Sequence, residues 1–124
     1  MSQEFDVIVV GARCSGSPLA ALLARRGVKV ALVEQATFPC DTLSTHILEA
    51  EALAFLERLG VMHEIRATGA PLIDRVDARQ EDLEYITTIP QPSGGVGGTA
   101  SVRRTLLDPI LAQAAAEAGA DLRM

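Results

Sequence analysis

The chain has 124 residues, which corresponds to about one domain, and 11 Lys and Arg against 16 Asp and Glu give a formal net charge of −5. An acidic chain lacks the basic face that tracks a phosphate backbone, so nucleic acid is not expected as a partner. The apolar runs are far shorter than about 18 residues and no apolar leader opens the chain, so neither a membrane span nor a secretory signal is predicted. Two cysteines, Cys14 and Cys40, make neither a disulfide framework nor a metal motif, which favours a reducing cytoplasm.

The start of the chain predicts a strand, a helix and a second strand. Residues 5–10 form a β-branched run without polar alternation, as in a parallel strand that is covered on both faces. Leucines recur at helical spacing between residues 15 and 26, and Gly27 follows as a stop signal. Residues 28–33 are again rich in valine and end at Glu34. The pattern indicates a βαβ unit over residues 1–34.

The rest of the chain predicts further elements of an α/β protein. A helix is expected over residues 46–59, and an antiparallel hairpin over residues 72–90, where apolar and polar residues alternate. The glycine-rich run at residues 94–98 is interpreted as a connecting loop, with a phosphate-cradling role as the less favoured alternative. A helix over residues 105–118 precedes the start of a strand at residues 120–124. These elements predict a Rossmann-like fold, a parallel sheet with an inserted antiparallel hairpin.

The turn after the first strand carries most of a dinucleotide-binding fingerprint, in the sequence Gly11-Ala12-Arg13-Cys14-Ser15-Gly16. In this fingerprint the first glycine makes the tight turn, the second lets the backbone approach a pyrophosphate, and the third lets helix and strand pack closely. Arg13 stands in the second place, where a side chain hinders close approach although a guanidinium can itself contact phosphate. Because the following helix N-terminus favours an anion, all six residues of the turn are candidate cofactor ligands.

Glu34 ends the second strand, 23 residues after Gly11, and is followed by Gln35. A carboxylate in this place accepts hydrogen bonds from both hydroxyls of an adenosine ribose, and it repels a 2′-phosphate. The position therefore disfavours NADP and leaves NAD or FAD. Glu34 and Gln35 complete the candidate site for the adenosine half of the cofactor.

Four stretches of the chain together carry a family pattern: Asp6-Val-Ile-Val-Val-Gly-Ala-Arg-Cys-Ser-Gly-Ser17, Val33-Glu34, Phe38-Pro-Cys-Asp-Thr-Leu-Ser-Thr-His46 and Arg103-Arg-Thr-Leu-Leu-Asp108. The pattern resembles the N-terminal, FAD-binding part of an FAD-dependent oxidoreductase or monooxygenase of the geranylgeranyl-reductase and aromatic-hydroxylase type. In such enzymes an Arg-x-x-Leu-Asp segment opens a helix beside the cofactor. The resemblance places its arginine on Arg104 and implies contact with the ribose or pyrophosphate of FAD.

The resemblance implies a flavoprotein with FAD as cofactor, NADH or NADPH as a candidate electron donor and a small organic molecule as substrate. Hydroxylation and double-bond reduction are both open. It also implies that the hairpin at residues 72–90 belongs to a substrate-side sheet. A later Gly-Asp segment and a substrate domain are part of this family, so residues 1–124 are expected to be the N-terminal part of a truncated FAD-binding domain.

Two other functions stay open beside this one. The chain is alternatively a nucleotide-binding module without turnover that another segment or chain completes, or, as a third choice, an NAD-dependent dehydrogenase. A strand at residues 120–124 would leave a sheet edge that favours self-association. His46 and His63 stand alone, so no metal site is expected, and no catalytic residue is identified. Cys14 is interpreted as a packing residue beside the cofactor.

Overall fold

A strand, a helix and a parallel strand form at the start of the chain in this computed structural model, which describes residues 4–89 and 98–124. β1 spans Val7–Val10, α1 spans Gly16–Ala24 and β2 spans Val30–Val33. β1 and β2 pair in parallel, because the helix between them returns the chain to the same end of the sheet. The predicted order of these three elements is confirmed.

A third parallel strand extends this sheet at the end of the chain. α4 spans Arg104–Glu117 and β8 spans Asp121–Arg123, close to the predicted helix and inside the predicted strand. β8 pairs in parallel with β2, which gives the strand order β1-β2-β8. The carboxyl ends of all three strands therefore meet at one edge of the sheet.

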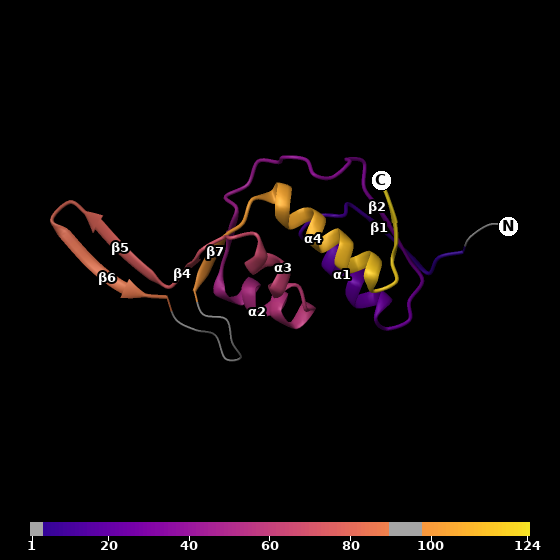
Figure 1. Cartoon of the computed structure of the whole chain (residues 1–124), viewed down its shortest axis with the longest axis horizontal. Helices are drawn as coiled ribbons and strands as arrows, with labels where there is room; N and C mark the ends of the chain where they lie inside the picture. The colour runs from indigo at the N-terminus through magenta and orange to yellow at the C-terminus, as the bar shows by residue number, and fades with distance from the viewer. Residues whose placement is uncertain (1–3, 90–97) are drawn as a thin grey trace. The chain divides into compact units, whose positions relative to one another are not determined.

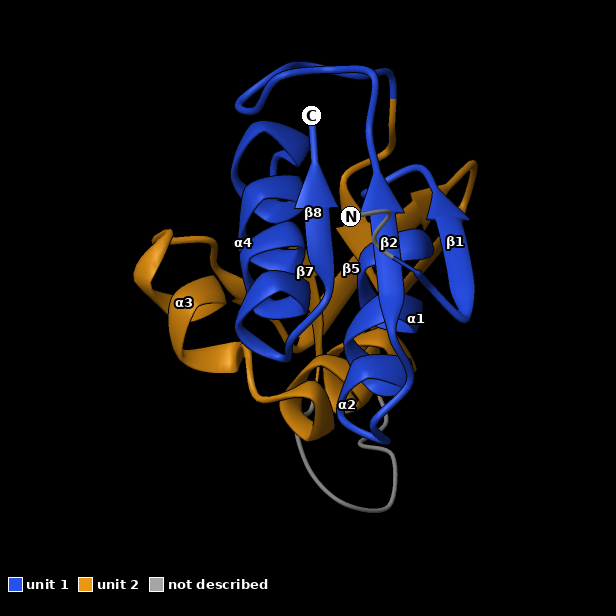
Figure 2. Ribbon diagram, turned by 90° about the vertical axis from the view of Figure 1, so that its right-hand side faces the viewer, with its two compact units in different colours: residues 1–43, 103–124 blue, residues 44–102 orange. Residues whose placement is uncertain are grey.

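Both helices cover the same face of the parallel sheet. Figure 2 shows β8, β2 and β1 side by side, with α4 and α1 behind them. Successive strand residues point to opposite faces; Val9 is accordingly buried toward the helices, whereas Ile8 is 65% exposed and Val10 83% exposed on the other face. The core between the sheet and the helices includes Val9, Ala20, Ala21, Val30, Leu32, Leu107, Leu111 and Ala115.

The chain divides into two compact units, residues 1–43 with 103–124 and residues 44–102. The elements of the second unit are β3 (Ile47–Leu48), α2 (Ala50–Leu59), α3 (Met62–Ala67), β4 (Leu72–Ile73), β5 (Arg75–Gln80), β6 (Leu83–Thr88) and β7 (Thr99–Ser101). β3, β7 and β4 form an antiparallel sheet in that order, and β5 and β6 form a separate two-stranded sheet. Figure 1 shows β5 and β6 as neighbouring arrows.

The prediction that the second helix begins at residue 46 is wrong. His46 has φ +60, a left-handed conformation that does not continue a helix, and α2 begins only at Ala50. Ile47 and Leu48 instead pair with β7. The helical spacing of apolar residues in α2 continues back into Ile47 and Leu48. Their backbone hydrogen bonds to β7, however, give these two residues an extended conformation.

The hairpin forms as predicted, with narrower bounds than residues 72–90. β5 and β6 pair in antiparallel fashion around the turn at Glu81 and Asp82. Leu72 and Ile73 lie outside it, because they pair with β7 as the separate strand β4. Of the glycine-rich run, only Gly98 falls within the described residues, so the predicted loop lies otherwise outside them.

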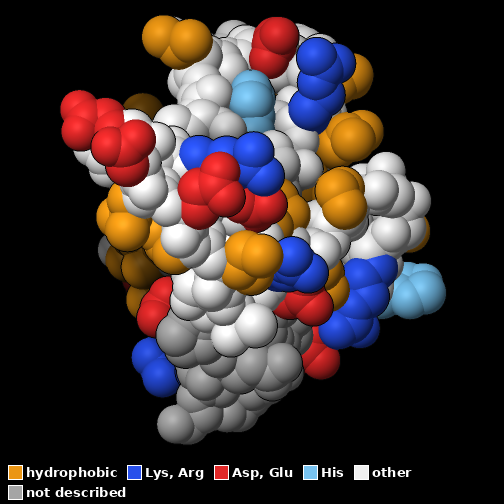
Figure 3. All heavy atoms as spheres, turned by 90° about the vertical axis from the view of Figure 1, so that its left-hand side faces the viewer, with side chains coloured by type: hydrophobic (Ala, Val, Ile, Leu, Met, Phe, Trp, Pro, Cys, Tyr) orange, Lys and Arg blue, Asp and Glu red, His pale blue; other side chains and the backbone are white. Residues whose placement is uncertain are grey.

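Exposed ion pairs lie on the hairpin. Arg79 Nε is 3.8 Å from Asp77 Oδ1 and 3.6 Å from Glu84 Oε1, and all three side chains are at least half exposed. Figure 3 shows acidic and basic side chains next to each other and beside hydrophobic ones. Such solvated pairs contribute little to stability.

Candidate cofactor-binding site

The turn between β1 and α1 depends on two glycines. Gly11 has φ +99, in the left-handed region that favours glycine, and its N–H donates to the carbonyl oxygen of Val33 at 2.7 Å. A Cβ on Gly16 would overlap the carbonyl oxygen of Gly11 and come within 3.2 Å of Val9 Cγ1. The first and third fingerprint glycines therefore do what the fingerprint requires, a tight turn and close packing of helix on strand.

Glu34 closes the carboxyl end of β2 and points its carboxylate back to this turn. Its Oε2 accepts a hydrogen bond from the N–H of Ala12 at 2.9 Å, and its Oε1 accepts one from the N–H of Ala36 at 3.0 Å. The side chain is only 5% exposed, and its Oε2 lies 3.9 Å from Arg13 Nε. Burial opposes ionisation, but the N–H groups of Ala36 and Ala12 and the charge of Arg13 outweigh it and hold the pKa of Glu34 below its usual value.

A cleft of about 560 Å³ opens beside the Glu34 carboxylate, at the carboxyl ends of β1 and β2. It is lined by Val10, Gly11, Arg13, Val33, Glu34 and Gln35. Each carboxylate oxygen has two acceptor positions, so the two backbone bonds leave Glu34 acceptor capacity for ligand hydroxyls. This end of a parallel sheet is where nucleotides bind in open α/β folds. The apolar walls, the ionised carboxylate and the glycine turn fit the adenosine half of a dinucleotide.

Arg13 borders the cleft with a side chain that is 28% exposed and bonded to protein groups. Its Nη1 donates to Asp108 Oδ2 at 2.8 Å, and its Nη2 donates to Cys40 Sγ at 3.0 Å. The guanidinium carbon lies 5.6 Å from the centre of the Phe38 ring. The hydrogen bond to Cys40, followed by that to Asp108, raises the pKa of Arg13. The sequence predicts phosphate as one partner of the Arg13 guanidinium. In the structure its partners are the protein groups Asp108, Cys40 and Phe38.

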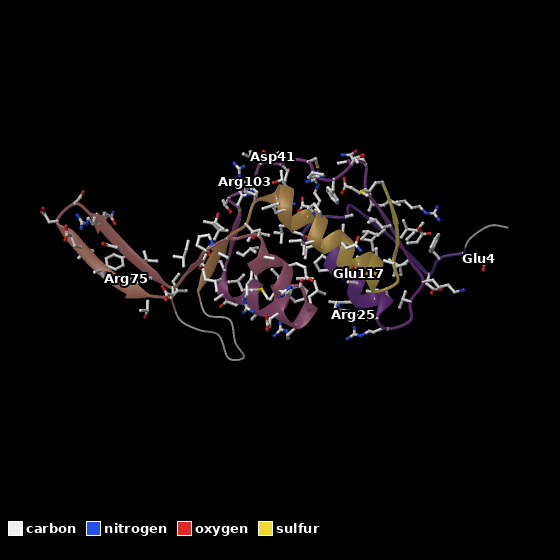
Figure 4. All side chains as sticks on the ribbon, in the orientation of Figure 1. Glu4, Arg25, Asp41, Arg75, Arg103 and Glu117 are labelled. Carbon is white, nitrogen blue, oxygen red and sulfur yellow. The ribbon has the colours of Figure 1, made fainter. Side chains whose placement is uncertain are left out.

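Asp108 joins the turn to α4. Its side chain is completely buried, and its Oδ1 accepts a hydrogen bond from Arg104 Nε at 2.7 Å, one helical turn earlier. The same oxygen lies 3.6 Å from Cys14 Sγ. The hydrogen bond to Asp108 raises the pKa of Arg104, whose side chain is 16% exposed. Arg103, labelled in Figure 4, precedes α4 and is exposed.

Cys14 and Ser15 precede the first residue of α1. Both residues are exposed, and the first N–H groups of a helix have no partner within it, so this end of α1 suits an anion. Removal of the Cys14 sulfur from water, aided by the neighbouring Asp108 carboxylate, raises the pKa of Cys14 despite the opposing charge of Arg104. Cys14 is therefore held as a protonated thiol rather than an activated thiolate.

The predicted cofactor-binding residues thus come together in one unit of the structure. Asp108 is the member that sequence reasoning did not select, although it stands four residues after Arg104, the spacing of an ion pair on one helix face. Cys40 was likewise not selected, and no local pattern marks it. His63 is exposed on α3. Within residues 4–89 and 98–124, no three acidic, histidine or cysteine side chains group as a metal site, and no helix has the length and apolarity to cross a bilayer.

Residues 4–124 match the family described as FAD binding domain. Menaquinone reductase of Mycolicibacterium smegmatis is 36% identical over an alignment that covers the whole chain and 30% of the reductase. The 2,4-dichlorophenol 6-monooxygenase of Cupriavidus pinatubonensis is 37% identical over 55% of this chain and 11% of its own length. The chain spans 25% to 30% of the length of the two curated relatives that match nearly all of it.

Solved structures share the fold. The myxobacterial chondrochloren halogenase, an FAD-dependent enzyme, superposes with a TM-score of 0.81 at 28% identity and covers 96% of this chain and 28% of its own. A geranylgeranyl bacteriochlorophyll reductase-like protein of Thermoplasma acidophilum gives a TM-score of 0.66 at 23% identity, over 95% of this chain and 29% of that one. The α/β, Rossmann-like fold expected from the sequence is confirmed.

Proposed function

This chain belongs to the FAD binding domain family, and we propose on that premise that its glycine turn and Glu34 hold the ADP half of FAD. The turn residues are Gly11, Ala12, Arg13, Cys14, Ser15 and Gly16. The observation that carries the assignment is the ionised, nearly buried Glu34 carboxylate, which faces the cleft behind Gly11. In this role it receives the two ribose hydroxyls, and it repels the 2′-phosphate of NADP.

The pyrophosphate of FAD is assigned to the first turn of α1 and to Arg104. The exposed Cys14 and Ser15 present the N–H groups of that helix end, and Gln35 borders the cleft next to Glu34. Arg104 adds a cation whose Nε is fixed by Asp108. Amide groups and a guanidinium are the donors that pyrophosphate groups find in proteins.

We infer that the whole protein is a flavin-dependent oxidoreductase. FAD supplies the redox chemistry when bound, and the protein's part is to bind it, orient it and control access to it. Relatives named as a menaquinone reductase and as monooxygenases support reduction and oxygenation as alternatives, and we propose double-bond reduction or hydroxylation of a small organic substrate. NADH or NADPH is the proposed electron donor, and the hairpin at residues 72–90 is proposed to belong to a substrate-side sheet.

Residues 1–124 by themselves are proposed to bind FAD or ADP without turnover. The fact that favours this second function is that the chain spans at most 30% of its full-length relatives. Half of a cofactor site gives a Kd in the micromolar to millimolar range, about −8 to −4 kcal/mol. Completion by another segment or chain would then restore the rest of the site, and the sheet edge at residues 120–124 would favour self-association.

A reducing, cytoplasmic location is proposed from the state of the cysteines. Cys14 and Cys40 are both free thiols. In the site they contact Asp108 and Arg13, roles that a thiol fills and a disulfide does not.

Calorimetric titration with ADP tests the assignment of Glu34. Glu34→Ala removes the acceptor of the ribose hydroxyls and should weaken ADP binding by about 1 to 3 kcal/mol. Glu57→Ala, which removes an exposed acid on α2, is the matched control and should leave the affinity unchanged. Equal ADP affinity of the Glu34→Ala variant and the parent chain would remove the basis of the proposed site. An oxidised-flavin spectrum of the purified protein would in addition distinguish FAD from NAD.

A further inference from the structure

We propose that Arg13, which stands where the fingerprint has its middle glycine, is a positioning residue: it binds the buried Asp108, so that the negative charge of Asp108 does not fall on Arg104 alone and Arg104 attracts the cofactor's pyrophosphate. This role rests on the proposed FAD site. It assigns Arg13 no direct contact with phosphate, and it predicts that the glycine usual at this position would impair the site rather than improve it.

The contacts of Arg13 are the first support. Nη1 lies 2.8 Å from Asp108 Oδ2, Nη2 lies 3.0 Å from Cys40 Sγ and Nε lies 3.9 Å from Glu34 Oε2. Each of the three guanidinium nitrogens therefore faces a protein group that attracts a cation. A guanidinium committed in this way cannot turn to a phosphate without leaving a completely buried carboxylate oxygen unpaired.

The charges of the cluster are the second support. Arg13 and Arg104 each bind one oxygen of Asp108, and Arg13 also faces the Glu34 carboxylate, so the two positive and two negative charges of these side chains balance. Without Arg13, Arg104 would face the whole charge of Asp108, and these side chains would carry a net charge of −1. Pyrophosphate is an anion, so the loss of one positive charge would weaken its attraction to this site.

Arg13 also ties the segment that follows Glu34 to the glycine turn. Phe38 stacks on its guanidinium and Cys40 accepts its hydrogen bond, and both residues come after the ribose-binding carboxylate in the chain. Glu34 is thereby held in two ways. The turn binds its carboxylate, and Arg13 fixes the segment that follows it in the chain. A planar guanidinium with several donors can make these contacts together, whereas a lysine ammonium cannot.

The test is the ADP affinity of four variants, measured by calorimetry at one fixed ionic strength. Arg13→Gly should weaken ADP binding about tenfold, the size of a lost charge-assisted contact. Adding Asp108→Asn to Arg13→Gly removes the charge that neutralises Arg104, so the double variant should bind ADP more tightly than Arg13→Gly alone. Arg13→Lys keeps the charge with fewer hydrogen bonds and should lie between parent and Arg13→Gly. Arg79→Gln, which removes an exposed charge on the hairpin, is the control and should change the affinity less than about twofold.

Urea unfolding of Arg13→Gly, Asp108→Asn and the double variant without ligand supplies the second readout. Arg13→Gly and Asp108→Asn should have strongly non-additive effects on stability, because they remove the two partners of one buried ion pair. Additive effects, or an Arg13→Gly variant that binds ADP as tightly as the parent, would overturn the positioning role. A double variant as weak as Arg13→Gly would point to direct phosphate contact and overturn it too. A parent chain that does not bind ADP would instead refute the proposed FAD site itself.

Discussion

Replacing Gly16 with alanine separates two physical effects of opposite sign. Gly16 is the first residue of α1, and in a helix alanine is more favourable than glycine by up to about 1 kcal/mol. A Cβ at this position, however, would overlap the carbonyl oxygen of Gly11. Helix propensity therefore predicts a gain in the free energy of unfolding, whereas close packing predicts a loss.

The overlap should decide the outcome, because the group it meets is backbone. The Gly11 carbonyl shares a peptide unit with the N–H of Ala12, which donates to Glu34 Oε2 at 2.9 Å, so it cannot rotate away as a flexible side chain would. Overpacking of this kind costs about 1 to 3 kcal/mol. A net loss of about 2 kcal/mol corresponds to a decrease in Tm of about 8 to 16 °C for a unit of this size. Gly16→Val, with a larger side chain, should lower Tm further.

Thermal unfolding followed by circular dichroism, without cofactor, measures this loss. Gly27→Ala is the matched control in the same unit, because Gly27 has φ +81 and open space around the position of a Cβ. Gly27→Ala should lower the free energy of unfolding only by the strain of a left-handed alanine, about 1 to 2 kcal/mol. Its decrease in Tm should therefore be smaller than that of Gly16→Val. An apo Tm that stays the same or rises in Gly16→Ala would refute the packing role of this glycine.

Two further predictions concern ionisable groups. Because the folded-state pKa of Glu34 is depressed, its stabilising effect is present above its unfolded pKa of about 4.3 and is lost as the pH falls through the folded value. Acid unfolding followed by circular dichroism should therefore be less steep in that range for Glu34→Gln than for the parent, and equal slopes would contradict the depressed pKa. Because the pKa of Cys14 is raised, iodoacetamide at about pH 8 should alkylate it more slowly in the folded chain than in urea, with Cys40→Ser as background and mass spectrometry as readout; equal rates would contradict this protonated thiol.

The parts of the fold that sequence predicts well are those made by neighbouring residues. β1, α1 and β2 follow from β-branched runs, leucine spacing and a glycine stop, all within a short stretch. The tight turn at Gly11 and the strand end at Glu34 follow in the same way. Glu34 could be selected because the fingerprint fixes both its distance along the chain from Gly11 and its place at the end of a strand.

The parts that sequence misses depend on partners far along the chain. Ile47 and Leu48 have helical spacing with the residues of α2, and Leu72 and Ile73 continue the alternation of the hairpin. Both pairs of residues instead form antiparallel pairs with β7, which contains only Thr99, Ala100 and Ser101. The sequence of β7 has no strand signal of its own. A three-residue strand is recognised only by its neighbours, so its effects on them could not be foreseen.

Arg13 is the instructive case, because the fingerprint interprets it as a defect. Judged within the turn, a side chain at the middle position hinders the approach of the pyrophosphate, and a guanidinium there has only the phosphate itself as an expected partner. Its main partner, Asp108, lies 95 residues further along the chain, completely buried and already bound to Arg104. A buried aspartate with one partner is costly, and the second arginine both lowers that cost and adds a positive charge beside the turn. Two features of a sequence therefore have to be considered together: an arginine at the middle position of the fingerprint and an Arg-x-x-Leu-Asp segment. When both are present, they predict an ion pair between that arginine and the aspartate of the segment.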